Sequence, residues 1–313
     1  MGWLRRIAVL ALALFVVGTL FSFGYNAVTA GAVAPPKGLT FVRTGDFRTR
    51  YLEWGTSGTA IVLVHGFVES ADTWSAVAQR LSRTHRVYAY DVLGFGYTDR
   101  VAPYGMAAET KQLLDFLAAM HLQRPTLVGH SAGAAIIASA ALQNPSAVGG
   151  LVFLDGDALS IGTGPRGVLS HVIVNPYRTT LFRMAVRSDW LIRTVYSTQC
   201  GPACPPLTSA GVQQWRRPLQ VAGALEALWA MTKSGGLGLP ASEVSRLTGV
   251  DVAKLVVFGA GDNLFGGNSA AETAARIGAP APILIRGARH LSLISHPDQV
   301  AAAIAGLAAA VSS

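Results

Sequence analysis

The stretch Thr126–Gly133 constrains the fold more than any other part of this chain. Thr126–Val128 is a short apolar run with β-branched residues, which is typical of a buried strand. Behind it, Ala134–Leu142 is rich in Ala, Ile and Leu, which predicts a tightly packed helix. The residues between them, Gly129-His-Ser-Ala-Gly133, fit the pattern G-x-S-x-G, whose sharp turn presents Ser131 as a nucleophile. Glycine is needed on both sides because larger side chains would collide with neighbouring elements.

Strands and helices alternate along most of the remaining chain. Ala60–Val64 is a continuous apolar run, which predicts a strand covered on both faces. The other expected strands are Leu39–Val42, Arg50–Trp54, Val87–Tyr90, Gly150–Leu154, Lys254–Phe258 and Ala281–Ile285, and further helices are expected at Trp74–Leu81, Met106–Met120 and Pro297–Val311. This alternation predicts an α/β fold with a mostly parallel sheet and helices on both of its faces.

The segment from about residue 158 to 240 interrupts the alternation. It contains aromatic residues, arginines, prolines and several short helical patterns, but no obvious strand of the sheet. An insertion of this size above a sheet is typical of a helical cap or lid. The composition alone assigns no binding role to any of its residues.

Composition bounds the class of protein. Of the 313 residues, 51% are hydrophobic and only 13% charged, so the chain can bury a sizeable core and is not disordered as a whole. Most of the net charge of +8 lies between Ser160 and Gly235, a segment that contains eight basic residues and two acidic ones. A solvated surface is the favoured interpretation, with attraction to an anionic membrane or acidic ligand second. The segment has no nucleic-acid motif, so no nucleic-acid partner is expected.

The N-terminal residues 1–30 predict a signal or a membrane anchor. Arg5 and Arg6 precede an apolar run, Ile7–Phe23, whose length lies between that of a secretory signal and a spanning helix. We favour an uncleaved anchor with the arginines on the cytoplasmic side and the catalytic domain outside the membrane. The alternative is cleavage after small residues at Val28 and Ala30, which would give a secreted protein. Residues 31–38 predict a linker before a domain at 39–313.

The only two cysteines are Cys200 and Cys204. In an oxidising compartment a disulfide across this short loop is expected, with two free thiols as the alternative. A zinc site is not expected, because no further cysteine pair or nearby histidine completes four ligands.

A serine nucleophile needs a base within reach and an acid that orients the base. His290 is the favoured base, because it lies in a loop directly after the last expected strand. His296, beside Pro297 at the start of the closing helix, suits a capping or surface role. His65 and His130 belong to turns with other geometry, and three further histidines have no motif around them: His85, His121 and His171.

Asp262 is the favoured acid. It follows the strand Lys254–Phe258, precedes His290 in the chain order Ser…Asp…His, and should lie at the same sheet edge as the serine. Asp155 and Asp157 also follow a strand and remain alternatives. Asp91 is expected to bind backbone groups at its own strand end.

The developing negative oxygen of an acyl-transfer intermediate needs two hydrogen-bond donors. The motif assigns one to the backbone N–H of Ala132, directly after the serine. The second should come from Phe67, in the His65-Gly66-Phe67 turn after Ala60–Val64. Losing one such donor typically costs about 2.7–4 kcal/mol of transition-state stabilisation.

From about Thr40 to its C-terminus, the chain resembles the α/β-hydrolase family in its capped form. The resemblance rests on motifs in family order: His65-Gly66-Phe67, Asp91 with Gly94-Phe-Gly96, Gly129-His-Ser-Ala-Gly133, Gly259 with Asp262, and His290 with Pro297. It implies an eight-stranded sheet, Ser131 as nucleophile, Asp262 as acid, His290 as base, and Phe67 and Ala132 as oxyanion donors. Ser131 argues against the haloalkane dehalogenases and epoxide hydrolases of the family, which use an aspartate there. The chain departs from the family in having Ser295-His296 where a glutamate often precedes the proline, which affects local packing.

The sequence therefore predicts a serine hydrolase that acts on a carboxylic ester and needs no cofactor or metal. The alternatives are a carbon–carbon bond hydrolase or a serine-dependent perhydrolase, and, from another class, a non-catalytic binding module.

Overall fold

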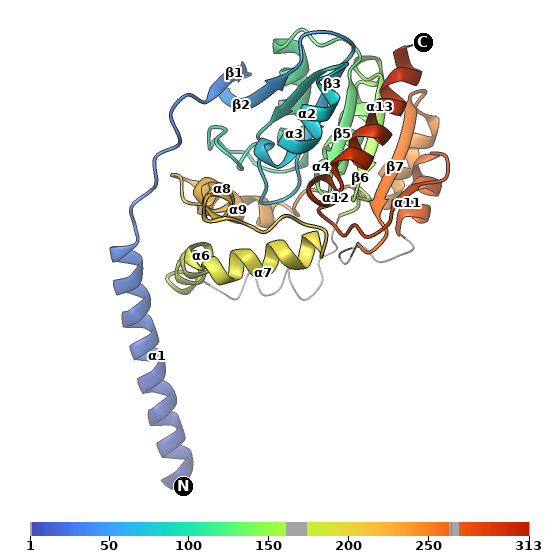
Figure 1. The fold of residues 1–313 in the computed structure, drawn as a ribbon. Coiled ribbons are helices and arrows are strands. Elements are labelled where there is room, and N and C mark those ends of the chain that lie inside the picture. The colour runs from blue at the N-terminus through green and yellow to red at the C-terminus, as the bar shows by residue number, and fades with distance from the viewer. Residues whose placement is uncertain (1, 161–173, 263, 265–268, 313) are drawn as a thin grey trace.

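An eight-stranded sheet forms the centre of the molecule (Figure 1). The computed structural model describes residues 2–160, 174–262, 264 and 269–312. The strands are β1 (Thr40–Thr44), β2 (Phe47–Trp54), β3 (Ala60–Val64), β4 (Arg86–Tyr90), β5 (Thr126–His130), β6 (Gly150–Leu154), β7 (Ala253–Gly259) and β8 (Ile283–Ile285).

The sheet is mixed but mostly parallel, which confirms the predicted fold class. Its order is β1-β2-β4-β3-β5-β6-β7-β8, and only the β1–β2 and β2–β4 pairs are antiparallel. The last strand begins at Ile283, two residues after the expected start. Because the parallel strands point the same way, the loops after β3, β5, β6, β7 and β8 meet at one edge.

Helices cover both faces of the sheet. The longer ones are α2 (Ser75–Leu81), α3 (Met106–Ala119), α4 (Gly133–Gln143), α11 (Ser269–Ile277) and α13 (Pro297–Ser312), with two short ones, α10 (Ala241–Ser245) and α12 (Ser292–Ser295). Helices α3, α4 and α11 share one hydrophobic core with the sheet, and α2 and α13 share the other.

The apolar run of β3 explains these two cores. Ile61 and Leu63 pack into the core of α2 and α13, whereas Val62 and Val64 pack into the opposite core. Successive side chains of a strand point to opposite faces, so a strand covered on both faces must be apolar at every position. Burying each such side chain stabilises the fold by about 1.5–3 kcal/mol.

The predicted cap is helical. It contains α6 (Tyr177–Arg187), α7 (Asp189–Cys200), α8 (Ser209–Arg216) and α9 (Ala224–Lys233), which gather at one end of the sheet (Figure 1). A disulfide joins Cys200, the last residue of α7, to Cys204 in the following loop. The part of the predicted cap at residues 161–173, including Arg166, lies outside the described residues.

The N-terminal segment forms one long helix, α1 (Gly2–Val28), which runs away from the end of the sheet that carries the cap (Figure 1). It is long and apolar enough to cross a membrane, and only 6% of its most apolar stretch is buried in the protein. An exposed apolar helix of this kind is typical of a signal or a membrane anchor.

A buried arginine joins β2 to the loop after β4. The Arg50 side chain is only 4% exposed and lies 3.3 Å from Asp91 and 2.9 Å from Asp72. Asp91 also accepts hydrogen bonds from the backbone N–H groups of Ala71 and Tyr97, so it binds backbone groups beyond its own strand end.

We expect Arg50→Met to lower the free energy of unfolding by about 3–5 kcal/mol, because it leaves the carboxylate of Asp91 buried without its cation. The matched control is Arg48→Met on the same strand, whose partner is Asp99 and whose side chain is 62% exposed. This control should cost less than about 1 kcal/mol. Denaturant unfolding of the full chain in detergent micelles measures both, and equal losses would contradict the role of Arg50.

Candidate active site

Ser131 lies at a strained turn between β5 and α4. Its backbone φ is +51°, in the left-handed region that costs free energy for a residue with a side chain. Flanking glycines make the turn possible, because a Cβ atom at Gly129 would collide with the backbone of Gly133, and one at Gly133 with the backbone of Val64. The Ser131 N–H donates to Leu154 O at 2.9 Å, which fixes the turn against the neighbouring strand.

His290 and Asp262 lie against each other. His290 Nδ1 is 2.9 Å from Asp262 Oδ2, and the two side chains are only 4% and 2% exposed. The other carboxylate oxygen accepts the backbone N–H of Leu264 at 2.8 Å, which orients Asp262 in its loop after β7. When Nδ1 donates its proton to a carboxylate, Nε2 of the neutral ring is the basic nitrogen. The structure thus pairs the favoured base with the favoured acid.

The rival acids have other partners. The carboxylate of Asp155 accepts hydrogen bonds from Gly259 N at 2.6 Å and from the Ser292 hydroxyl. Burial raises the pKa of Asp155 to about 6, although the nearby His130 opposes the rise. Asp157 accepts the backbone N–H of Leu159 at 2.9 Å. These contacts give both aspartates a role in holding loops.

The remaining rival base, His296, binds a neighbour in its own segment. Its Nδ1 lies 2.9 Å from the Ser295 hydroxyl at the start of α13. This contact agrees with the expected local role at the start of the closing helix.

A cavity of about 770 Å³ brings the predicted residues together. Ser131, His290, Phe67 and Ala132 all border it. Ala132 immediately precedes α4, where the helix dipole favours negative charge. Most of the wall is apolar, and the cap supplies much of it through Phe182, Ala185 and Val186 of α6 and Leu191, Ile192 and Val195 of α7. The volume and lining are typical of a site for a small, largely apolar ligand.

The sequence model that describes the alpha/beta hydrolase family matches residues 61–303 of this chain. These residues cover the sheet from β3 onward, the cap and the cavity. The chain belongs to the alpha/beta hydrolase family. Its relatives include pimeloyl-[acyl-carrier protein] methyl ester esterase of Edwardsiella ictaluri, 25% identical over 260 residues, or 81% of this chain and 95% of that enzyme. A protein of Mycobacterium tuberculosis without an assigned function is 36% identical over 123 residues, and this match spans 39% of the chain and about a third (36%) of the relative.

Two solved structures share the fold. A serine hydrolase involved in carbazole degradation superposes with a TM-score of 0.71 at 23% identity, over 87% of this chain and 98% of that one. A membrane phospholipase A superposes with a TM-score of 0.70 at 20% identity, over 100% of this chain and 98% of that one.

A buried ion pair lies beneath this hydrolase site, and sequence reasoning missed it. Glu69, in the loop after β3, approaches His130 Nδ1 to 3.0 Å and also accepts the N–H of Gly66. His130 Nε2 lies 2.9 Å from the backbone carbonyl oxygen of His290. The pair therefore joins three loops that carry predicted catalytic groups: the oxyanion loop, the serine turn and the loop of the base. The sequence feature that could have indicated this pair is the acidic residue Glu69, which closely follows the His65-Gly66-Phe67 turn.

The two partners of this pair shift each other's pKa. Burial alone would lower the pKa of His130, but the Glu69 carboxylate raises it to about 9. Burial would raise the pKa of Glu69, but the positive imidazolium of His130 holds it below its usual value. His130 is therefore positively charged at neutral pH, and both of its ring nitrogens donate.

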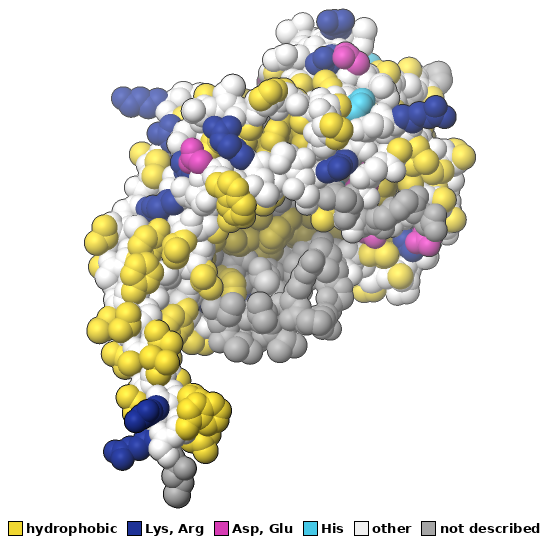
Figure 2. All heavy atoms as spheres, turned by 60° about the horizontal axis from the view of Figure 1, so that its bottom comes forward, with side chains coloured by type: hydrophobic (Ala, Val, Ile, Leu, Met, Phe, Trp, Pro, Cys, Tyr) yellow, Lys and Arg dark blue, Asp and Glu magenta, His cyan; other side chains and the backbone are white. Residues whose placement is uncertain are grey.

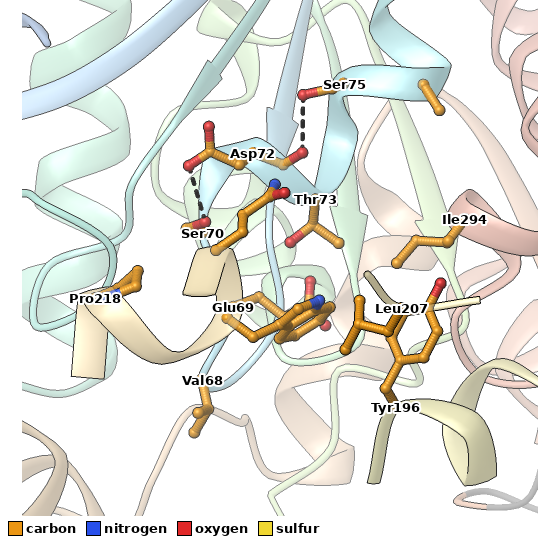
Figure 3. Close-up of a pocket in the computed structure, with 13 residues that line it drawn as sticks. Val68, Glu69, Ser70, Asp72, Thr73, Ser75, Tyr196, Leu207, Pro218 and Ile294 are labelled. Atoms are coloured by element: carbon orange, nitrogen blue, oxygen red, sulfur yellow. Dashed lines mark hydrogen bonds between the residues drawn. The ribbon is translucent and has the colours of Figure 1, made fainter. Parts of the chain in front are cut away.

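Glu69 also borders a second, smaller cavity of about 230 Å³. Figure 3 shows this cavity between the segment from Glu69 to Ser75 on one side and Tyr196 and Leu207 of the cap on the other. Hydrogen bonds from the hydroxyls of Ser70 and Ser75 to Asp72 order the first side. Four residues border both cavities and separate one cavity from the other: Val68, Glu69, Tyr196 and Trp215.

We expect the stability of this hydrolase to fall as the pH rises from about 6.5 to 9. The folded-state pKa of His130, about 9, lies above the usual value of 6.5. Its stabilising contribution is therefore complete below about pH 6.5 and is lost as the pH rises through about 9. The opposite holds for Glu69, whose lowered pKa adds stability above about pH 4.5 that is lost on acidification.

Denaturant unfolding of the full chain at a series of pH values in detergent micelles tests this expectation. The loss of stability should approach about 1.4 kcal/mol per pH unit at its steepest in the wild type and should be absent from His130→Gln. His121→Asn, which changes an exposed histidine, is the control and should keep the wild-type slope. Equal slopes in His130→Gln and the wild type would contradict the ion pair.

Proposed function

We propose that this chain is a serine hydrolase that cleaves carboxylic esters through an acyl-enzyme on Ser131. The observation that carries the proposal is the 2.9 Å contact between His290 Nδ1 and Asp262, beside the cavity that both His290 and Ser131 border. A nucleophile on a strained turn, a base and an orienting acid are the groups that acyl transfer requires.

The reaction would proceed in two halves. In the first, Ser131 Oγ attacks the ester carbonyl while His290 Nε2 takes the serine proton, and Asp262 holds the imidazole in the correct tautomer. The backbone N–H groups of Phe67 and Ala132 would stabilise the oxyanion. As the intermediate collapses, the carbon–oxygen bond to the alcohol breaks and His290 passes its proton to that oxygen. In the second half, water attacks the acyl-enzyme while His290 takes its proton; the bond between the acyl carbon and Ser131 Oγ then breaks, His290 returns the proton to Oγ, and the acid leaves.

Two further observations favour an ester. The wall of the cavity is mostly apolar, which suits an acyl chain better than a highly charged substrate. One relative, a methyl ester esterase, matches this chain over 95% of the relative's own length. Within the family, a serine at position 131 also distinguishes this chain from members that use an aspartate nucleophile.

We also propose that α1 remains attached and anchors the protein in a membrane, with the hydrolase domain on the extracytoplasmic side. Its 27 residues span roughly 40 Å, more than the roughly 30 Å of a bilayer's apolar layer. Arg5 and Arg6 at its start favour the cytoplasmic side for that end. Secretion after cleavage near Ala30 is the alternative.

Ser131→Ala should abolish labelling by a fluorophosphonate probe and lower kcat for a short p-nitrophenyl ester by at least about 10⁴-fold, because the nucleophile is lost. Asp262→Asn should lower kcat by about 10⁴-fold, since the imidazole would take the wrong tautomer. Asp157→Asn is the matched control and should change turnover by less than about tenfold, within the effect of an ordinary change in packing. Labelling of Ser131→Ala at the wild-type level would refute the proposed nucleophile, and unchanged turnover in Asp262→Asn the proposed acid.

The intact chain should sediment with membranes and resist extraction by alkaline carbonate, because a spanning helix is held by its apolar surface. N-terminal sequencing of the mature protein should recover the residues before Ala30. A chain found free in the medium and starting after Ala30 would overturn the anchor.

A further inference from the structure

One side of α1 is packed against the protein, although the rest of this helix is exposed. Figure 2 shows that hydrophobic side chains cover the length of α1 and continue onto the body of the molecule beside it. The less exposed positions recur at helical spacing and are small or polar: Gly18, Thr19, Ser22, Tyr25 and Asn26 of the helix, and Thr29 just after its end. Such a stripe is expected where an otherwise apolar helix packs against another helix inside a membrane.

The partner of this stripe is the cap helix α6. The hydroxyls of Thr19 and Tyr177 are 2.6 Å apart, and Asn26 Nδ2 donates to the carbonyl oxygen of Pro176 at 2.9 Å. Arg183 Nη1 donates to the carbonyl oxygen of Asn26 at 2.6 Å. This arginine therefore supplies a partner to one of the carbonyls that the end of α1 leaves without an intrahelical donor.

These contacts fix the depth of α6 relative to the proposed anchor. If the apolar layer begins after Arg6, its roughly 30 Å accommodates about 20 helical residues and ends near Asn26. Thr19 lies seven residues before Asn26, which places it about 10 Å inside the layer. The Tyr177 hydroxyl, bound to Thr19, lies at this depth, and the adjacent Pro176 carbonyl, bound to Asn26, lies nearer the boundary, so the start of α6 enters the apolar layer.

The outer side chains of the cap suit that position. Leu181 and Met184, one turn apart on α6, are 53% and 46% exposed, and Trp190 at the start of α7 is 72% exposed. Tryptophan is enriched at the boundary between membrane and water, where its ring is amphipathic. The guanidinium of Arg178 lies 4.4 Å from the centre of the Trp229 ring. This cation–π contact gives the positive charge a partner within the protein.

The same two helices form a wall of the catalytic cavity. Phe182, Ala185 and Val186 of α6 line it, together with Leu191 and Ile192 of α7. Helix α6 therefore has one side on the anchor, one side on the cavity and one exposed apolar side. The helix whose exposed side carries Leu181 and Met184 therefore also forms part of the wall of the cavity that Ser131 borders.

We propose that the exposed side of α6 and the start of α7 dock into the outer leaflet of the membrane that holds α1, and that the site takes its substrate, a lipid ester with a long acyl chain, from that leaflet. This inference rests on the proposed ester hydrolysis and on the retained anchor. The exposed side of α6 would contact lipid, and the apolar wall of the cavity would hold the acyl chain.

Site-directed labelling tests the docking. Both native cysteines are in the disulfide, so a new cysteine is the only free thiol of the chain. A fluorophore on Leu181→Cys or Trp190→Cys, in the full chain in phosphatidylethanolamine–phosphatidylglycerol vesicles, should lose most of its emission to a spin-labelled lipid and little to aqueous iodide. The control is Ala309→Cys, exposed on α13, which should respond in the opposite way. Quenching by iodide at 181 and 190, or protection from both quenchers, which would indicate a protein partner, overturns the docking.

Hydrolysis measured in parallel tests the substrate. Leu181→Asp should lower the hydrolysis of long-chain phosphatidylglycerol in vesicles by about tenfold or more, since an acidic residue is strongly disfavoured inside the apolar layer. It should leave the turnover of soluble p-nitrophenyl butyrate and the fluorophosphonate labelling unchanged, because Leu181 does not line the cavity. Ala309→Asp carries the same charge and should change neither activity.

The outcomes separate the two proposals. A wild type that is not labelled and cleaves neither ester refutes the serine hydrolase itself. A wild type that cleaves the soluble ester but not the vesicle lipid, or Leu181→Asp that cleaves the lipid at the wild-type rate, refutes the inference about the membrane and leaves the hydrolase intact.

Discussion

The close backbone packing around the turn between β5 and α4 is the constraint on which the rest of the site depends. The positions of Gly129 and Gly133 have no room for a Cβ atom, because the backbones of the turn and of β3 already fill the space. This packing brings α4 against the sheet and turns the backbone of Ser131 into the left-handed region. The strain is tolerated because both cores, one on each side of the sheet, hold the strands that the turn connects. The turn that carries the proposed nucleophile is thus stabilised by apolar residues buried on both sides of the sheet.

Around that turn, buried polar contacts hold loops that the sheet alone would leave independent. Glu69 and His130 link the oxyanion loop to the serine turn and to the backbone of His290. Asp155 links the loop after β6 to Gly259 at the end of β7 and to Ser292 behind the base. Each of these charges is nearly or fully buried and would be costly without its partners. Ionic and polar contacts therefore hold the loops beneath the site, and apolar side chains of the cap enclose the cavity above it.

The parts of this arrangement that follow from local patterns could be predicted from the sequence. Apolar runs indicated the central strands, and the turn motif indicated Ser131 as the nucleophile, because these signals reside within a few neighbouring residues. The partners of His130 could not be predicted, since Glu69 is 61 positions away and His290 is 160 positions away. The chain order favoured Asp262, but Asp155 stayed an alternative because both follow strands that end at the same edge; the contact between Asp262 and His290 supports Asp262. The helix α11 also escaped prediction, since its apolar side is mostly alanine, threonine and a single isoleucine.

Helix α6 serves both as the partner of α1 and as a wall of the cavity, and this double role has a practical consequence. Removing the N-terminal segment to obtain a soluble enzyme would leave Tyr177 and Arg183 without the groups they bind on α1. The shortened protein would keep its sheet and its serine turn, while the cavity wall that α6 forms would lose its contacts with α1. Substrate preferences measured on it would then describe a rearranged cavity, so a search for the substrate of this hydrolase belongs with the whole chain.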